Sequence, residues 1–160
     1  MEIQKQFCTF FLKGLMFGID VLKVQEIILP QEMTEVPLAP KAIRGLINLR
    51  GQVVTAIDLR SWLGFDSLNN EIGSMNVVIR AEDDIMSFLV DDIGDVVEPE
   101  EKSFESPPET LEESIRELID GVYKLENQLL LVMNAERTFE LFARRFSDRP
   151  SIMAEPQVIN

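Results

Sequence analysis

Residues 45–60 have the sequence GLINLRGQVVTAIDLR, in which Arg50 stands beside Gly51 and between two apolar segments. Two apolar segments joined by a short glycine-containing turn are typical of a β-hairpin. Turns lie on protein surfaces because their backbone groups need water or a partner. The stretch therefore predicts a hairpin that presents Arg50 as an exposed contact residue.

A weaker copy of this stretch begins 76 positions later (121 minus 45), where residues 121–134 read GVYKLENQLLLVMN. The identical pairs are Ile43 and Ile119, Gly45 and Gly121, Leu49 and Leu125, and Gln52 and Gln128. A structural unit that is used twice determines the architecture of a chain. We therefore expect two similar subdomains within residues 1–146, approximately 5–65 and 66–140, and leave open whether strands are exchanged between them. Gly45, Gly51 and Gly121 are expected to form turns.

The composition fits a chain with a real core, since 46% of its 160 residues are hydrophobic. The one cysteine, Cys8, cannot form an intrachain disulfide and is expected to be a small buried hydrophobe, as in a reducing compartment. The net charge of −13 disfavours nucleic acids and anionic lipids as partners. We find no signal peptide and no membrane span, and so expect a cytoplasmic protein without direct membrane insertion.

The acidic side chains are concentrated in the second half of the chain. Residues 66–146 hold 20 acidic and 7 basic side chains, whereas residues 1–65 hold 6 acidic and 7 basic ones. Such a surface provides solubility, or it steers the protein toward a basic partner. The sequence alone leaves both interpretations open.

Short apolar segments separated by turns indicate a mainly β protein built from two small antiparallel barrels. The expected strands include residues 7–12, 15–19, 75–81, 85–97 and 129–133, and residues 20–29 fit either a bent strand or one helical turn. We predict one helical turn at residues 40–45, a helix at residues 110–119 and a C-terminal helix at residues 136–146. Residues 147–160 are expected to form a flexible tail.

The residue types needed for most catalytic sites are missing. The chain contains no histidine, so Ser-His and Cys-His pairs and the common zinc sites cannot form. It also has no glycine-rich phosphate loop. The adjacent acids at 83–84 and 91–92 would point to opposite faces of a strand and could not flank one bond. We therefore expect no enzymatic activity, no cofactor and no metal.

Three side chains are candidates for contacts with a partner protein, and each has an ordinary structural alternative. Arg50 either forms a forked contact with a partner carboxylate or is solvated or paired within the chain, with Asp58 or Glu26. Glu26 is an exposed strand acid or a contact residue. Trp62, the only tryptophan, packs in the core or between the barrels, or it is an interface residue.

Residues 17–27, 37–40, 43–54 and 57–60, together with 89–93 and 121–139, closely resemble the chemotaxis coupling protein CheW family. The resemblance covers roughly residues 5 to 143. It implies two five-stranded SH3-like antiparallel barrels packed together, with short helices and a C-terminal helix. It also implies a non-enzymatic adaptor that couples chemoreceptors, the methyl-accepting chemotaxis proteins, to the histidine kinase CheA.

The resemblance also implies roles for individual residues. The chemoreceptor cytoplasmic tip, a helical hairpin, would dock in a groove between the subdomains near Val24, Glu26 and Arg50. The kinase regulatory domain, or other CheW copies, would contact a loop that holds Pro107, Pro108 and Glu109, as part of a ring. The protein would then join membrane receptor arrays through its partners.

Two other functions remain open from the sequence. One is a CheW-like coupler of a non-flagellar chemosensory pathway that controls pili, second messengers or gene expression. The other is a small-barrel ligand-binding module, a class in which such barrels are commonly reused. The length of 160 residues leaves no room for a receiver or kinase module and favours a freestanding coupler.

Overall fold

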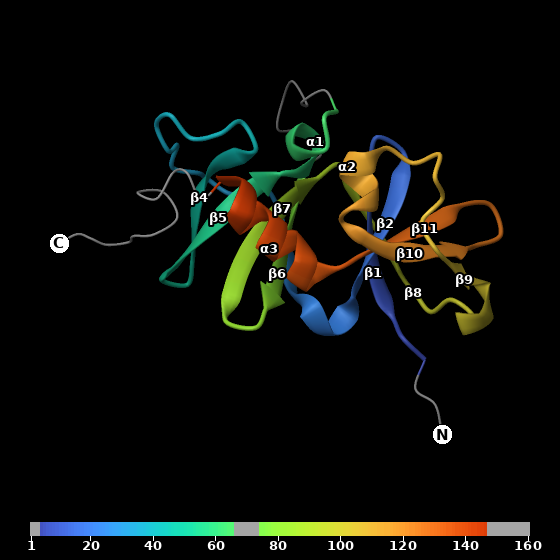
Figure 1. Cartoon of the computed structure of the whole chain (residues 1–160). Coiled ribbons are helices and arrows are strands. Elements are labelled where there is room, and N and C mark those ends of the chain that lie inside the picture. The colour runs from blue at the N-terminus through green and yellow to red at the C-terminus, as the bar shows by residue number, and fades with distance from the viewer. Residues whose placement is uncertain (1–3, 66–73, 147–160) are drawn as a thin grey trace.

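The computed structural model describes residues 4–65 and 74–146, so the predicted tail at 147–160 lies outside the described part. The described chain forms two β-sheets, with short helices between some of the strands and one longer helix after the last strand (Figure 1). The mainly β fold with short helices and a C-terminal helix is therefore confirmed.

One sheet has six strands in the order β8-β1-β2-β11-β10-β9. Its strands are β1 (Phe7–Leu12), β2 (Leu15–Asp20), β8 (Asp92–Val97), β9 (Phe104–Glu105), β10 (Ile119–Lys124) and β11 (Leu129–Met133). The other sheet has five strands in the order β3-β6-β7-β5-β4. Its strands are β3 (Val24–Ile28), β4 (Ile43–Leu49), β5 (Gln52–Asp58), β6 (Met75–Ala81) and β7 (Asp84–Val90).

The described helices are short except for the last. They are η1 (Val21–Lys23), α1 (Leu59–Trp62), η2 (Glu101–Ser103), α2 (Glu113–Arg116) and α3 (Ala135–Phe146). The ambiguous residues 20–29 contain one helical turn, η1, followed by a strand, β3. Two helix predictions were wrong. The turn at 40–45 is not helical because β4 begins at Ile43, and the helix at 110–119 is reduced to α2 because β10 begins at Ile119.

The sheets differ in two respects from a pair of five-stranded antiparallel barrels. The two-residue strand β9 pairs with Val122 and Tyr123 of β10 and adds a sixth strand to one sheet. In addition, each sheet contains one parallel pair, β2 with β11 and β5 with β7. These pairs arise because each sheet is made of two antiparallel hairpins that meet along strands running in the same direction.

The hairpins are exchanged between the two halves of the chain. The β1–β2 hairpin belongs to the sheet that holds β8–β11, and the β6–β7 hairpin belongs to the sheet that holds β3–β5. Each half, 5–65 or 66–140, thus contributes its first hairpin to the sheet of the other half. A sheet built in this way cannot form from one half of the chain alone.

The internal repeat is confirmed by the pairing of the strands. In the β4–β5 hairpin Gly45 lies opposite Ala56, and in the β10–β11 hairpin Gly121 lies opposite Val132, the same pairing 76 positions later. Both hairpins have a β-bulge immediately before the glycine. Gly45 and Gly121 therefore lie inside strands, and their assignment as turn residues is corrected.

These two glycines are required by a neighbouring segment of backbone. A Cβ on Gly45 would lie 2.8 Å from the carbonyl oxygen of Thr34, and one on Gly121 would lie 2.4 Å from that of Glu105. A close backbone approach at a bulge is a common reason for glycine in a strand. Thr34 forms an isolated bridge with Leu46, in the position that β9 occupies beside β10 in the other sheet.

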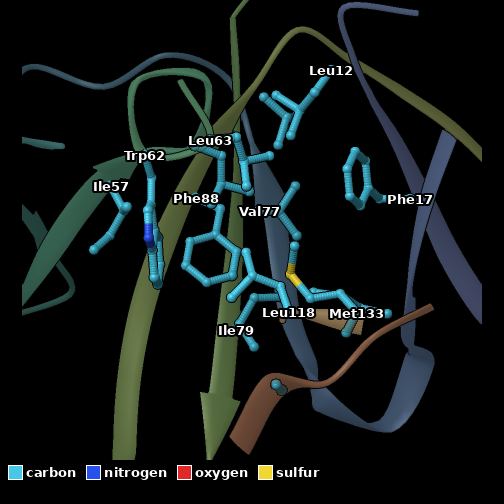
Figure 2. Close-up of a cluster of buried hydrophobic side chains, with 14 of the residues drawn as sticks. Leu12, Phe17, Ile57, Trp62, Leu63, Val77, Ile79, Phe88, Leu118 and Met133 are labelled. Atoms are coloured by element: carbon cyan, nitrogen blue, oxygen red, sulfur yellow. The ribbon is translucent and has the colours of Figure 1, made fainter. Parts of the chain in front are cut away.

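One apolar core is shared by the two sheets. Phe17 and Met133 of the six-stranded sheet belong to the same buried cluster as Ile57, Val77 and Phe88 of the five-stranded sheet (Figure 2). Helix α3 extends this cluster, because Phe139 contacts Phe88 and Phe142 contacts Trp62. Trp62 is 9% exposed, which confirms that it packs in the core.

A partly buried ion pair lies between the two sheets at the edge of the core. Arg60 of α1 donates two hydrogen bonds to Asp91, both of 2.6 Å. Asp91, between β7 and β8, also accepts a hydrogen bond of 2.8 Å from the backbone of Lys13 in the β1–β2 turn. Burial alone would raise the pKa of the Asp91 carboxyl, but these hydrogen bonds outweigh burial and hold its pKa below the ordinary value.

Gly121, at the bulge in β10, provides a test of the close approach between this strand and the backbone of Glu105. We expect Gly121→Ala to lower the free energy of unfolding by about 2 kcal/mol, because the new methyl group would overlap backbone atoms of Glu105 and the ring of Phe104. Gly18→Ala is the matched control, since its nearest neighbour is the flexible end of Leu130 at 2.9 Å. Urea unfolding measures both variants, and a smaller loss for Gly121→Ala than for Gly18→Ala would contradict the explanation.

The Arg60–Asp91 pair provides a second test, which depends on pH. Asp91→Asn is expected to destabilise the protein by about 2 kcal/mol at neutral pH, whereas Asp92→Asn, at an exposed neighbour, should have little effect. Because the folded pKa of Asp91 is lowered, the contribution of its carboxylate is complete above about pH 4 and is lost as the pH falls through the folded pKa.

Thermal unfolding of both variants at several pH values measures this difference. The gap between the wild type and Asp91→Asn should narrow below about pH 4. A gap that stays constant down to pH 2 would exclude the charge as its source.

Candidate functional site

The β4–β5 turn presents Arg50 as the sequence predicted. Leu49 pairs with Gln52, so Arg50 and Gly51 form a two-residue turn with φ values of 52° and 86°. Two successive residues with positive φ match the twist of a β-hairpin. Gly51 adopts its positive φ without steric cost because glycine has no Cβ. The Asn48 side chain accepts a hydrogen bond of 2.8 Å from the backbone of Gly51 and stabilises the turn. Gly51 is therefore a turn residue.

The guanidinium of Arg50 forms a forked ion pair with the carboxylate of Glu26. The two hydrogen bonds measure 2.5 and 3.0 Å. The Arg50 side chain is 75% exposed and that of Glu26 is 18% exposed. The hydrogen bonds from Arg50 also hold the pKa of the Glu26 carboxyl below its ordinary value. Among the alternatives for Arg50, pairing with Glu26 is the one observed, while Asp58 pairs with Arg44.

This ion pair connects the two edges of the five-stranded sheet. Glu26 lies in β3, the first strand of the sheet order, and Arg50 follows β4, the last strand. The pair therefore links the edges of an open sheet across its end. Since three quarters of the Arg50 side chain stays exposed, the guanidinium also remains accessible to a partner protein.

Val24 occupies a different environment from the ion pair. It is half-buried at the start of β3 and packs against the main core. Exposed apolar side chains occur nearby in the sequence, at Leu29 after β3 and at Val53 in β5, which are 68% and 64% exposed. The main pocket of the described chain does not include Val24, Glu26 or Arg50. The apolar groove centred on Val24 therefore stays a prediction.

The loop predicted to contact the kinase lies on the other sheet. Pro107, Pro108 and Glu109 lie between β9 and α2, at the edge of the six-stranded sheet, whereas Arg50 belongs to the five-stranded sheet (Figure 1). The two prolines are half-buried and Glu109 is exposed. The structure thus places the two predicted contact regions apart, on different sheets.

The sequence did not predict the main pocket of the described chain, which measures about 710 Å³. Its lining comes from residues between Gln4 and Glu136, contributed by β1, β2, β9, β10, β11, η1, η2 and α3 and by the segments that connect them. No local motif marks such residues, because only the exchange of hairpins brings them together. The concentration of acidic residues in the second half of the chain was the one available signal.

The described residues contain no helix that is both long and apolar enough to cross a membrane.

Comparisons with known proteins identify the family. A family model described as a CheW-like domain matches residues 6–142. The chemotaxis protein CheW of Bacillus subtilis is 31% identical over 132 residues, which cover 82% of this chain and 85% of the relative. The chemotaxis protein CheW of Treponema pallidum is 28% identical over 140 residues, which cover 85% of this chain and 82% of the relative.

A solved structure supports the same assignment. The scaffolding protein TtCheW from Thermoanaerobacter tengcongensis superimposes with a TM-score of 0.74 at 25% sequence identity. The match covers 82% of this chain and 90% of that protein. Together with the family model, this similarity supports two SH3-like barrels as the fold. The chain therefore belongs to the CheW-like family, whose members are non-enzymatic scaffold proteins of chemotaxis.

Proposed function

We propose that this protein couples chemoreceptors to the histidine kinase CheA, with the receptor tip bound at the Arg50–Glu26 pair. The observation that carries the proposal is the exposed guanidinium, held by a forked ion pair on a two-residue turn. Family membership supports the coupling role, since the relatives are chemotaxis and scaffolding proteins.

The geometry of the ion pair suits a second carboxylate. A guanidinium carries five N–H donors, and Glu26 accepts from two of the Arg50 nitrogen atoms. The remaining donors can bind a carboxylate or a carbonyl of a receptor helix. Because Glu26 already fixes the side chain, binding would cost less conformational entropy than with a free arginine. Val24, Leu29 and Val53 would supply apolar contacts with the same helix.

The kinase regulatory domain is proposed to bind at the loop that contains Pro107, Pro108 and Glu109. Proline restricts the backbone, so a loop with two adjacent prolines presents Glu109 with little entropy to lose. Contacts on two different sheets would let one molecule hold a receptor and a kinase together, and other CheW copies could take the place of the kinase in a ring. The protein would thus be cytoplasmic and would reach membrane receptor arrays through these partners.

A charge-swap experiment tests the receptor contact. Arg50→Glu should weaken binding to a receptor cytoplasmic fragment at least about tenfold, since a repulsive pair replaces an attractive contact. The melting temperature should change by less than about 2 °C, because exposed ion pairs contribute little to stability. Isothermal titration calorimetry and thermal unfolding measure the two effects.

The double variant Glu26→Arg with Arg50→Glu separates the two roles of the pair. It restores an attraction between the sheet edges but leaves a carboxylate at position 50. If Arg50 contacts the receptor, binding should remain weak in the double variant, whereas full recovery would mean that the pair only holds the sheet edges. Arg80→Glu is the matched control. Arg80 is exposed on β6, and within the described residues its guanidinium donates hydrogen bonds to Gln25.

The kinase contact is tested by reversing the charge of its exposed acid. Glu109→Arg should weaken binding to the CheA regulatory domain about fivefold or more and leave receptor binding unchanged. Glu140→Arg on α3 is the control, since the Glu140 side chain is 69% exposed and lies outside the loop. Surface plasmon resonance with each partner measures both effects, and equal losses for the two variants would contradict a specific contact.

A further inference from the structure

The main pocket opens at one end of the six-stranded sheet, where β1 begins and where β2 and β11 end. Phe7, Asp20 and Met133 lie at these strand ends, and η1 and the start of α3 lead from the pocket toward the other sheet. At about 710 Å³ it has the size of an ordinary ligand site. It includes neither the Arg50–Glu26 pair nor the 107–109 loop, so it is distinct from both proposed contact regions.

One wall of the pocket is aromatic. The ring of Tyr123 lies 5.6 Å from that of Phe7 and 4.9 Å from that of Phe104, between ring centroids. Phe7 is buried, but Phe104 is 41% exposed. The three rings offer a surface for the apolar stem of a side chain and for a cation above a ring face.

Tyr123 lines the pocket, and although the residue as a whole is only 8% exposed, its hydroxyl is not an enclosed unpaired atom and opens into the pocket. No hydrogen bond joins this hydroxyl to the described residues. A hydroxyl that opens into a pocket binds water until a ligand group replaces the water. Burial and the nearby carboxylate of Glu101 raise the pKa of the Tyr123 hydroxyl, which therefore stays protonated and neutral. A neutral hydroxyl can accept a hydrogen bond from a bound N–H group.

The charged side chains around the pocket are mostly acidic. They are Lys5, Asp20, Lys23, Glu101, Asp120 and Glu136. Lys23 and Glu136 form an ion pair with each other across the rim. Asp120 is likewise paired with Arg137 and accepts a hydrogen bond from Asn134. The charge that remains for a ligand comes from the carboxylates of Asp20 and Glu101 and the ammonium group of Lys5, so the pocket favours a cation over an anion.

We propose that this pocket binds a lysine or arginine side chain from a partner protein segment. The aliphatic stem would pack on Phe104 and Tyr123. The cationic head would donate to the Tyr123 hydroxyl and face the carboxylate of Glu101. A purely apolar ligand would displace water from the hydroxyl without replacing its hydrogen bond, and an acidic ligand would meet the carboxylates of Asp20 and Glu101. The pocket is thus a further interaction surface beyond the receptor and kinase contacts.

A titration with a short peptide tests the proposal directly. The probe is acetyl-Gly-Arg-Gly-amide, and the matched neutral probe is the same peptide with citrulline in place of arginine. We expect the arginine peptide to shift the ¹⁵N–¹H resonances of Tyr123, Val132 and Glu136, which line the pocket. The citrulline peptide should shift them little. The shifts should weaken with added salt, because the attraction is partly electrostatic.

Point variants assign the binding to specific groups. Glu101→Gln and Tyr123→Phe should each raise the Kd of the arginine peptide about threefold or more. Both changes are nearly isosteric, and the hydroxyl that Tyr123→Phe removes makes no described hydrogen bond, so the fold should persist. Glu112→Gln is the control, because Glu112 is exposed outside the pocket. Equal binding of both peptides, shifts scattered over the acidic surface, or no shifts at all would each overturn the proposal.

Discussion

The exchange of hairpins around one apolar core is the constraint on which the rest of this structure depends. The β1–β2 hairpin pairs with strands from the second half of the chain, and the β6–β7 hairpin pairs with strands from the first half. Side chains such as Phe17 and Phe88 then enter one buried cluster. Because neither sheet is complete without both halves, the two sheets are expected to unfold together and to hold their contact surfaces in a fixed relation.

That fixed relation matters for a scaffold protein. The Arg50–Glu26 pair lies at the edges of the five-stranded sheet, and the loop at 107–109 lies at the edge of the six-stranded sheet. If these surfaces bind a receptor and a kinase as proposed, the shared core and the Arg60–Asp91 pair transmit the position of one partner to the other. A flexible linker between the sheets would not impose such a geometry.

Arg50 illustrates how one residue can have a structural and a binding role. Its forked pair with Glu26 connects the sheet edges, yet its side chain remains largely exposed. From the sequence alone, pairing of Arg50 within the chain and contact of Arg50 with a partner protein were alternatives. The structure allows both, because a guanidinium has more donors than one carboxylate can occupy.

The sequence by itself determined the family, the repeat and the Arg50 turn, since each depends on residues that are adjacent in the chain or recur at a fixed spacing. The tertiary structure alone decided which hairpins share a sheet, why Gly45 and Gly121 are glycines, and where the helix predicted at 110–119 ends. It also created the pocket beside Tyr123. The physical reason is the same in each case: strand pairing and close backbone approach join segments far apart in the chain, and local patterns carry no record of such contacts.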